Sequence, residues 1–448
     1  MSRRPLACVV LAAGKGTRMK STLPKVLHAV AGRSMIGHVL SAISGLGPDH
    51  VVVVVGPGME QVTKAVAPFP TVIQLEQRGT ADAVRATREA LSGFEGDVLV
   101  VYGDTPLIST ETLRHMIDAR RHASNPAVVV LGMRLAEPGA YGRVIVNPRG
   151  EVVKIVEYLD ADESERQVEL CNAGLMAFDG ARLFELLGRV RDDNAKKEFY
   201  LTDVVALARS DGASVRVVET TPAEVLGVNS RAELADIERL LQQRLRRAAM
   251  DGGATLLYPE TVYFSIDTCL GRDVVVGPHV MFGPGVAVGD NVEIRAFCHL
   301  ERAKVESGAV IGPFARLRPG AEIGNDAHIG NFVEIKASCV EAGAKVNHLT
   351  YIGDAIIGAR ANIGAGTITC NYDGFQKHRT EIGVEAFIGS NASLVAPVKI
   401  GAGAIVAAGS VITSDIPVDA LAVARGRQET HQGWAPRFRQ RAKAKKKS

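Results

Sequence analysis

A glycine-rich turn flanked by basic residues follows the first apolar run of the chain. Residues 6–12 lead into Ala13-Gly14-Lys15-Gly16-Thr17-Arg18-Met19, and Leu23-Pro24-Lys25 comes shortly after. Such a turn between a strand and a helix presents backbone N–H groups to a phosphate, and Arg18 and Lys25 add positive charge. It is not a Walker A loop, which needs the pattern Gly-x4-Gly-Lys-Ser/Thr. Nor is it a dinucleotide fingerprint, because Met19 stands where the third glycine should be. Taken as Gly-x-Gly alone, it is equally consistent with a plain structural turn.

A carboxylate follows another apolar run. Asp104, in Tyr102-Gly103-Asp104, comes directly after the run at residues 98–102, so we expect it at the carboxyl end of a strand. Ligands gather at that edge of open α/β sheets. A hard carboxylate there suits Mg²⁺, which usually takes one or two carboxylates together with substrate phosphates. A lone aspartate in this position is otherwise often a helix cap, so both interpretations stay open at this point.

Cationic residues, a histidine and a polar loop gather in one stretch of the C-terminal half. His348 lies where a six-residue apolar repeat shifts phase, and Asn371-Tyr372-Asp373-Gly374 cannot continue that repeat and must loop outward. Arg318 replaces a repeat glycine, and Lys336 follows a regular strand. A lone histidine is more often structural than catalytic, but one beside such a loop is a candidate base.

The repeat itself predicts the architecture of this half. Glycine recurs at Gly271, Gly277, Gly283 and Gly289, with valine three residues after each. The six-residue repeat of aliphatic residues continues to Ile412. Hexapeptides of this kind predict a parallel β-helix, in which three repeats make one turn and the aliphatic residues stack inward. Glycine is expected at the corners, where φ must often be positive. The strict period disfavours a Gly/Val-rich sandwich. The repeats alone fit an inert spacer as well as an acyltransferase.

The N-terminal half has a βαβ rhythm. Apolar runs at residues 7–12, 51–55, 72–75 and 98–102 alternate with helical stretches, which predicts a mostly parallel sheet flanked by helices. From Ser230, apolar residues recur at spacings of three and four, and Ser230 with Glu233 predicts a capping box. We therefore expect an α/β chain with three parts. These are a Rossmann-like domain over residues 1–229, a connecting helix over 230–250, and a left-handed parallel β-helix over 251–448.

Composition excludes several other classes. The formal charge of +3 and the 46% apolar content indicate an ordinary soluble protein with no nucleic-acid partner. No apolar run approaches the roughly 18 residues that span a membrane, and the run after Arg3 and Arg4 is too short for a signal peptide. The six cysteines form no CxxC pair, which predicts reduced thiols in a cytoplasmic protein, with neither disulfides nor zinc. The basic segment over residues 437–448 is expected to be a solvated, disordered tail.

The longer string Leu11-x-x-Gly14-x-Gly16-Thr17-Arg18-Met19-x4-Pro24-Lys25 closely resembles the signature of sugar-nucleotidyltransferases. The resemblance implies catalytic roles for Arg18 and Lys25, and Mg²⁺ ligands in Asp104 and Asn229. The nucleotide- and sugar-binding residues it implies are Leu11, Ala12, Ala13, Gly14, Lys25, Gln74, Gly79, Thr80, Tyr102, Gly103, Asp104, Gly142, Glu157, Asn172 and Asn229. Among these, Gln74-x4-Gly79-Thr80 resembles a uracil-recognition segment. The chain departs from the pattern at Ala81-Asp82, where glycine and histidine are expected, and at Lys196-Lys197, where uncharged residues are expected.

Over residues 6–430 the chain resembles the family of bifunctional N-acetylglucosamine-1-phosphate uridyltransferases and glucosamine-1-phosphate acetyltransferases. The specific motifs are Arg316-Leu317-Arg318-Pro319-Gly320 and residues 364–374. The resemblance implies that His348 is the general base for the sugar amine and that Glu334 positions this histidine or the amine. It implies a sugar-phosphate site of Arg318, Lys336, Tyr351 and Asn362, and an acetyl-CoA site of Ala365, Asn371, Tyr372, Ser390, Ala408 and Arg425. Members of the family are trimers with acetyl sites between neighbouring β-helices, so a homotrimer is implied.

The resemblance further implies two consecutive reactions on small-molecule substrates, with no nucleic-acid or membrane partner. Glucosamine 1-phosphate is first acetylated by acetyl-CoA, and UTP then donates a uridylyl group to give UDP-N-acetylglucosamine and pyrophosphate. That product feeds peptidoglycan and, in many bacteria, lipopolysaccharide. Two alternatives remain: a single-function nucleotidyltransferase with an oligomerising β-helix, and a non-catalytic regulatory subunit. The intact His348 and Asn371-Tyr372 argue against the first, and the intact Arg18, Lys25 and Asp104 against the second.

Overall fold

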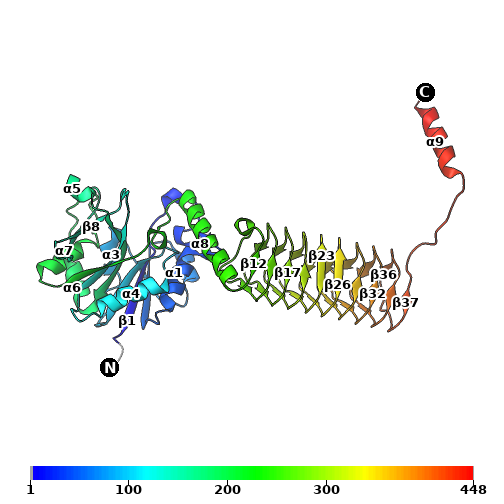
Figure 1. Ribbon diagram of the computed structural model, residues 1–448, viewed down its shortest axis with the longest axis horizontal. Coiled ribbons are helices and arrows are strands. Elements are labelled where there is room, and N and C mark those ends of the chain that lie inside the picture. The colour runs from blue at the N-terminus through cyan, green and yellow to red at the C-terminus, as the bar shows by residue number, and fades with distance from the viewer. Residues whose placement is uncertain (1–3, 447–448) are drawn as a thin grey trace. The chain divides into compact units, whose positions relative to one another are not determined.

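The computed structural model describes residues 4–446, and the chain divides into two compact units, residues 1–245 and 246–448. The first unit is a sheet flanked by helices, and the second is a stack of short parallel strands (Figure 1). The predicted fold class, an α/β domain followed by a hexapeptide β-helix, is confirmed. None of the helices in residues 4–446 is long and apolar enough to cross a membrane.

A nine-stranded mixed sheet organises the first unit. Its strands are β1 (Leu6–Leu11), β4 (His50–Val55), β5 (Thr71–Ile73), β6 (Asp97–Tyr102), β7 (Val128–Arg134), β8 (Arg143–Val146), β9 (Val152–Val156), β10 (Leu170–Asp179) and β11 (Val215–Glu219). The order across the sheet is β11-β7-β10-β6-β1-β4-β5, with the β8–β9 hairpin attached to β10. As predicted, β1 lies parallel between β4 and β6. The expectation of a mostly parallel sheet missed β10, which runs antiparallel to both β6 and β7.

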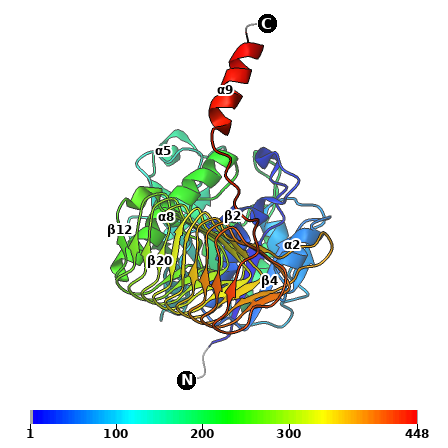
Figure 2. The ribbon, with the colours of Figure 1, turned by 90° about the vertical axis from the view of Figure 1, so that its right-hand side faces the viewer.

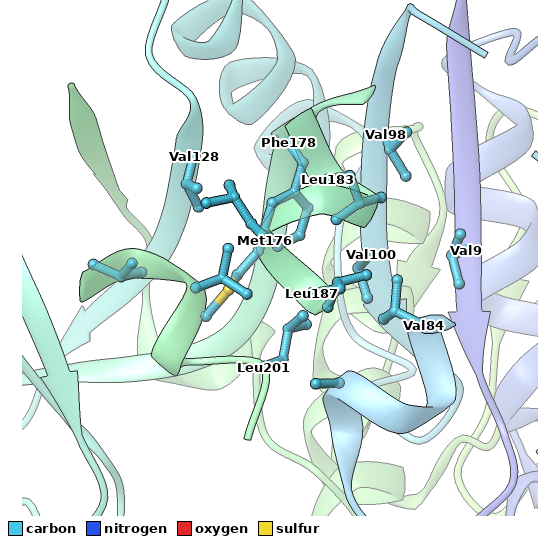
Figure 3. Packing of buried hydrophobic residues seen from close by; sticks show 14 of the residues in the cluster. Val9, Val84, Val98, Val100, Val128, Met176, Phe178, Leu183, Leu187 and Leu201 are labelled. Atoms are coloured by element: carbon cyan, nitrogen blue, oxygen red, sulfur yellow. The ribbon is translucent and has the colours of Figure 1, made fainter. Parts of the chain in front are cut away.

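Helices and short turns cover this sheet. They are η1 (Thr17–Met19), η2 (Lys25–Leu27), α1 (Met35–Ser44), α2 (Glu60–Ala65), α3 (Thr80–Arg85), α4 (Thr110–Arg120), α5 (Glu163–Arg166), α6 (Gly180–Arg189), α7 (Asp203–Ser210) and η3 (Pro222–Glu224), with a small hairpin of β2 (Ala29–Val30) and β3 (Arg33–Ser34). Residues of β1 alternate between two apolar cores, one on each face of the sheet. Val9 belongs to the same core as Val100, Met176 and Phe178 (Figure 3), whereas Val10 belongs to the core on the other face. A strand buried on both faces reads as a continuous apolar run, which is why the sequence located it.

The helix α8 (Arg231–Asp251) follows, with Ile237 and Leu241 buried. Its first turn differs from a capping box in one respect. Ser230 Oγ accepts a hydrogen bond from the Glu233 N–H at 3.2 Å, as expected, but the Glu233 carboxylate accepts from the N–H of Asn229 at 2.6 Å. The start of α8 therefore fixes the backbone of Asn229.

Three parallel sheets make up the second unit, and we name them faces A, B and C in the order the chain visits them. Face A contains β12 (Thr255–Leu256), β14 (Val275–Val276), β17 (Glu293–Ile294), β20 (Val310–Ile311), β23 (His328–Asn331), β26 (Lys345–His348), β29 (Asn362–Ile363), β32 (Phe387–Ile388), β35 (Ile405–Val406) and β37 (Leu421–Ala422). Face B contains β15 (Met281–Phe282), β18 (His299–Leu300), β21 (Arg316–Leu317), β24 (Glu334–Lys336), β27 (Tyr351–Gly353), β30 (Ile368–Cys370), β33 (Ser393–Val395) and β36 (Val411–Ile412). Face C contains β13 (Cys269–Leu270), β16 (Ala287–Val288), β19 (Ala303–Val305), β22 (Ala321–Ile323), β25 (Ser338–Val340), β28 (Ala355–Ile357), β31 (Thr380–Ile382) and β34 (Val398–Ile400).

The coils lie one behind another in Figure 2, and each strand pairs with the strand one turn later. A short turn, η4 (Pro259–Thr261), precedes the regular coils. Every second strand residue points inward, so Ile311, Ile329 and Val346 stack in register and are fully buried. Buried aliphatic stacking explains the period of six.

The repeat glycines play a different part from the one expected. A positive φ occurs two residues later, at Asp273 (57°) and His279 (56°), and not at Gly271 or Gly277. A Cβ on Gly271 would lie 2.6 Å from the carbonyl carbon of Gly289 in the next coil. These glycines are thus required by the close approach of adjacent backbones. The left-handed φ falls two residues later, on a glycine at Gly285 (71°) and on other residue types at Asp273, His279 and Asn291.

The C-terminal segment also differs from expectation. The predicted disordered tail is instead the helix α9 (Trp434–Lys445), although all its side chains are exposed. The rings of Trp434 and Phe438 stack on it, with centroids 5.1 Å apart. Lys447 and Ser448, the end of the predicted tail, lie outside the described residues.

Candidate active sites

The turn after β1 brings Lys25 close to the strand end. Gly16 has a left-handed φ of 59°, and a Cβ at this position would lie 2.6 Å from the Cβ of Lys25. Gly14, by contrast, has no neighbouring atom within 4 Å of such a Cβ and is exposed. The second glycine therefore permits the approach of Lys25, and the first leaves open space where a phosphate could lie.

Lys25 connects the two residues expected to hold a metal. Its Nζ contacts the Asp104 carboxylate and lies 3.3 Å from Oδ1 of Asn229. Asp104 follows β6, and Asn229 is fixed by the start of α8 as described above. A carboxylate oxygen and an amide oxygen thus face one cationic group, and these are hard donors of the kind Mg²⁺ prefers. No group of three or more His, Cys, Asp or Glu side chains in residues 4–446 could hold a metal by itself, so the remaining ligands would be phosphates or water.

A cavity of about 470 Å³ lies at this edge of the sheet. It contains ten of the residues expected to bind nucleotide or sugar, namely Leu11, Ala12, Ala13, Gly14, Lys25, Gln74, Gly79, Thr80, Tyr102 and Asp104. Lys15, Val26, Glu76, Gln77, Ala83 and Glu198 also line it and were not expected from the sequence. Gly103 lies buried beside it, where its N–H donates to the Leu11 carbonyl at 2.9 Å. Arg18, on η1, is exposed and does not line the cavity.

The three residues expected to contact the sugar lie together on the β8–β10 side of the unit. The N–H of Asn172 donates to the carbonyl of Gly142 at 2.8 Å, and a Cβ on Gly142 would lie 3.3 Å from the Glu157 carboxylate. Burial raises the pKa of Glu157, while the ammonium of Lys196 and a hydrogen bond from Thr202 act in the opposite direction. Lys196, one of the departures from the family pattern, therefore supplies charge next to this group.

The residues expected to bind acetyl-CoA form a column in the second unit. We name as the A–B edge the corner segments that link each face A strand to the next face B strand. Backbone hydrogen bonds join successive corners there. Gly366 N donates to His348 O (3.2 Å), Asn391 N to Ala365 O (2.8 Å) and Gly409 N to Ser390 O (2.8 Å). Arg425 closes the column by donating from Nη1 to the carbonyl of Ala408 at 2.7 Å. Four expected acetyl-CoA residues thus share one edge with His348.

His348 is held by a residue that the sequence did not indicate. Its Nδ1 lies 2.8 Å from Oδ1 of Asn331, which is its register partner one coil earlier. With the Asn331 amide in this orientation its oxygen accepts from an Nδ1–H, and this tautomer leaves Nε2 of the exposed His348 as the basic nitrogen. We expected Glu334 to position His348 or the amine. In the structure the Glu334 carboxylate accepts from Nη1 of Arg318 at 2.8 Å.

The sugar-phosphate candidates cluster on face B. Beside Arg318, Nζ of Lys336 lies 3.5 Å from the Asp354 carboxylate, and Nδ2 of Asn371 contacts the same carboxylate. The sequence missed Lys377, which the bridge between Tyr372 and Lys377 turns back toward the coil. A hydrogen bond with Lys336 and the repulsion between the two ammonium groups lower the pKa of Lys377. A cluster of cations under such repulsion fits a dianionic phosphate.

Asn362 does not join this cluster within one chain. It is the first residue of β29 on face A, next to the buried Ile363, and it pairs with Lys345 and Phe387. Alternation along a strand directs its side chain outward from face A, away from Arg318 and Lys336 on face B. One chain therefore presents the acetyl-site candidates on two faces of a convex coil. All six cysteines are free, and Cys370, beside Asn371, is partly buried.

Comparison with known proteins agrees with both units. Residues 8–251 match the family model of the MobA-like NTP transferase domain, and residues 302–337 and 379–414 match that of the bacterial transferase hexapeptide. Among curated relatives, "Bifunctional protein GlmU" of Paramagnetospirillum magneticum is 62% identical over 446 residues, covering 100% of this chain and 99% of the relative. Its namesake in Rhodospirillum rubrum is 62% identical (97% of each chain), and that of Zymomonas mobilis is 53% identical (99% and 100%). The chain therefore belongs to the GlmU family of bifunctional enzymes, with a nucleotidyltransferase in its first unit and a hexapeptide acetyltransferase in its second.

Proposed function

We propose that the cavity of the first unit binds UTP and N-acetylglucosamine 1-phosphate and that the sugar phosphate attacks the α-phosphorus of UTP. The observation that carries this proposal is the convergence of Lys25, Asp104 and Asn229 at the edge of a cavity that Gln74 and Gly79 also line. Lys25 neutralises charge on the phosphates, and Arg18 reaches in from η1 when substrate is bound. Such transfer depends on positioning and charge neutralisation more than on covalent chemistry by the protein.

The metal at this site is proposed to be Mg²⁺, bound by Asp104 and Asn229 together with substrate phosphates. The small hard cation supplies electrostatic stabilisation of the leaving pyrophosphate. The chain's own contribution is to hold the two oxygens in place, through β6 for Asp104 and through the Glu233–Asn229 hydrogen bond for Asn229. Gly142, Glu157 and Asn172 are the proposed contacts of the sugar.

In the second unit, His348 is proposed to take a proton from the amine of glucosamine 1-phosphate as that amine attacks acetyl-CoA. The sugar phosphate lies on Arg318, Lys336, Tyr351 and Lys377, and the cofactor follows the A–B edge past Ala365, Ser390, Ala408 and Arg425, with Asn371 and Tyr372 beside it. His348 lies one coil before the corner of Ala365, with Nδ1 on Asn331 and Nε2 available, which supports its assignment as the base. The N-acetylglucosamine 1-phosphate released is the substrate of the first unit. Both reactions are proposed to occur in the cytoplasm.

The acetyl site is proposed to form between copies in a homotrimer. Asn362 and the face B cluster point from different faces of one chain, so a neighbouring chain must bring them together. Exposed aromatic rings on the A–B edge support such a contact. His279, Phe297, Phe314 and Phe332 stack in a column with centroids 4.9, 4.8 and 5.1 Å apart. Contiguous exposed apolar surface of this kind is typical of interfaces.

Two measurements test these proposals. The first measures pyrophosphate release and CoA release on the same purified sample of each variant. Asp104→Ala should lose pyrophosphate release and keep CoA release, and His348→Ala should do the reverse. Retention of uridylyl transfer by Asp104→Ala at ordinary Mg²⁺ would remove Asp104 from the metal site. For the trimer, Arg318→Ala and Asn362→Ala chains, each altered on a different face, are co-expressed with different tags. Mixed trimers, isolated through both tags, should regain acetyl transfer at about one third of their sites, because only one of their three interfaces joins the two intact contributions. The matched control co-expresses Arg318→Ala chains with Lys336→Ala chains. Both residues lie on face B, so every site keeps one of the two losses and no acetyl transfer should return.

A further inference from the structure

The side-chain amide of Gln74 is held by two acceptors of the protein. Gln74 lines the first-unit cavity and is only 5% exposed. Its Nε2 donates to the carbonyl of Gly79 at 2.9 Å and to Oδ2 of Asp82 at 2.8 Å. An amide nitrogen has two hydrogens, so these two bonds use both. The carbonyl oxygen Oε1 is therefore the atom of this amide that can meet a ligand.

The opposite orientation of the amide is disfavoured by the same two groups. A half-turn would bring Oε1 against Gly79 O and Asp82 Oδ2, both of which can only accept while the carboxylate is ionised. Buried acceptors that face one another lose their hydrogen bonds and repel. Asp82 is itself fixed, because its Oδ2 also accepts from the N–H of Arg78 at 3.2 Å.

The segment that carries these acceptors is rigid. The N–H of Phe199 donates to Arg78 O at 2.7 Å, and the N–H of Ala81 donates to Phe199 O at 2.9 Å. Gly79, with φ of 115°, lies so close that a Cβ there would be 2.5 Å from the Phe199 carbonyl oxygen. Gln74 is also tied by its backbone N–H, which donates to Val55 O at 2.9 Å. The orientation of the amide is thus set before a nucleotide arrives.

We infer that Asp82 is a positioning residue that selects uracil over cytosine by fixing the orientation of the Gln74 amide. The two bases differ at N3, where uracil has an N–H donor and cytosine has a lone pair. An amide locked with its oxygen toward the base accepts a hydrogen bond from uracil N3–H and repels the N3 of cytosine. A free glutamine could rotate and serve either base. A site built around one hydrogen-bond pattern discriminates strongly against the analogue that lacks it.

This inference rests on the proposed contact of Gln74 with the base, and it goes further by assigning the selection to its neighbour. Asp82 is one of the positions at which the sequence departs from the family pattern. The proposed control of the Gln74 orientation therefore depends on a residue that the family pattern does not include.

The experiment measures kcat/KM for UTP and for CTP, by pyrophosphate release, in full-length protein. Asp82→Ala should lower the ratio of the two values by about tenfold or more, the effect of losing one charge-assisted hydrogen bond. Asp82→Asn keeps an acceptor without the charge and should lower the ratio less. Glu76→Ala is the matched control, since Glu76 also lines the cavity and loses the same charge without contacting Gln74. Thermal melting verifies that the first unit of each variant is folded, and CoA release from the second unit normalises the enzyme concentration.

Gln74→Ala tests the contact with the base separately from the role of Asp82. Gln74→Ala and Asp82→Ala can differ in their effect on the ratio of kcat/KM for UTP to that for CTP. If only Gln74→Ala lowers this ratio, Gln74 discriminates between the bases but the inference about Asp82 is wrong. If Gln74→Ala leaves the ratio unchanged while UTP is still used, the proposed base contact is wrong and the uridylyltransferase assignment stands. An equal fall in kcat/KM for both nucleotides in Asp82→Ala would indicate a merely structural role and overturn the inference. In the double variant, Asp82→Ala should add nothing to Gln74→Ala, because the first acts through the second.

Discussion

Replacing Gly16 by alanine should disable uridylyl transfer by displacing Lys25, although every substrate-binding side chain is retained. The new Cβ would lie 2.6 Å from the Cβ of Lys25, whereas carbon atoms in contact are normally about 3.5–4.0 Å apart. One of the two segments must therefore move by about 1 Å. Because η2 begins at Lys25, the whole turn that carries this lysine is displaced from Asp104 and Asn229.

Two effects contribute, and they can be separated. Alanine at a left-handed φ costs about 1–2 kcal/mol, which lowers the melting temperature of a unit of this size by several degrees. A misplacement of about 1 Å at a catalytic group lowers the rate by about 10²-fold. Gly150→Ala is the matched control for the first effect, since Gly150 has φ of 77° and no atom within 4 Å of its Cβ.

The assay compares pyrophosphate release per folded protein in the two variants, with CoA release as the internal reference. Both variants should lose similar stability. Gly16→Ala should lose about a hundredfold in kcat/KM for uridylyl transfer, and Gly150→Ala should lose little. Equal activities in the two variants would refute the claim that the glycine is required by the approach of Lys25.

Three further outcomes are expected. His348→Ala should lower CoA release per folded protein by about 10²- to 10⁴-fold, and an unchanged rate would make His348 structural. Asn331→Ala should lower CoA release less and should shift the pH–rate profile, because the tautomer of His348 is no longer fixed. Cys370→Ala should keep substantial acetyl transfer, since the amine attacks acetyl-CoA directly, and a trapped acetyl-enzyme would contradict this. Burial, with Glu157 and Asp160 nearby, raises the pKa of Asp203 from 3.8 to about 6. The folded state therefore binds more protons than the unfolded state between these values, and stability falls as pH rises through that window. Asp203→Asn should stabilise the first unit by about 1–2 kcal/mol at pH 8, allowing for partial solvent screening, and the gain should vanish near pH 4; a gain independent of pH would exclude this cause.

Patterns of burial made most of the fold predictable. The β1 run and the hexapeptide period record side chains that must be apolar because both faces of a strand, or the inside of a coil, exclude water. The apolar pattern does not depend on strand direction, so the antiparallel orientation of β10 was not predicted. The repeat glycines were found but misinterpreted, since a residue without Cβ serves close approach as well as positive φ. The basic tail reads as disordered from charge alone, whereas α9 forms from residues of high helix propensity.

Site residues were predictable where a motif fixes them to a strand end, as at Lys25 and Asp104. Contacts between residues one coil apart were not, because a separation of 17 residues has meaning only once the coil geometry is known. Asn331 beside His348 is such a case. Lys377 was missed because the loop after Cys370 has no period, and only the turn back at Tyr372 brings it to Lys336.

Trp434, on α9, is the single tryptophan of the 448-residue sequence. Its ring stacks on Phe438 with an angle of 8° between the planes, and both side chains are half-exposed. Indole fluorescence excited selectively in the unmodified protein therefore originates from this helix alone. The emission is a built-in probe of the C-terminal segment, because neither the nine-stranded sheet domain nor the β-helix contains a tryptophan. Titration with UTP or with acetyl-CoA can thus reveal whether filling either site changes the surroundings of α9, and Phe438→Ala provides the spectrum of the unstacked ring.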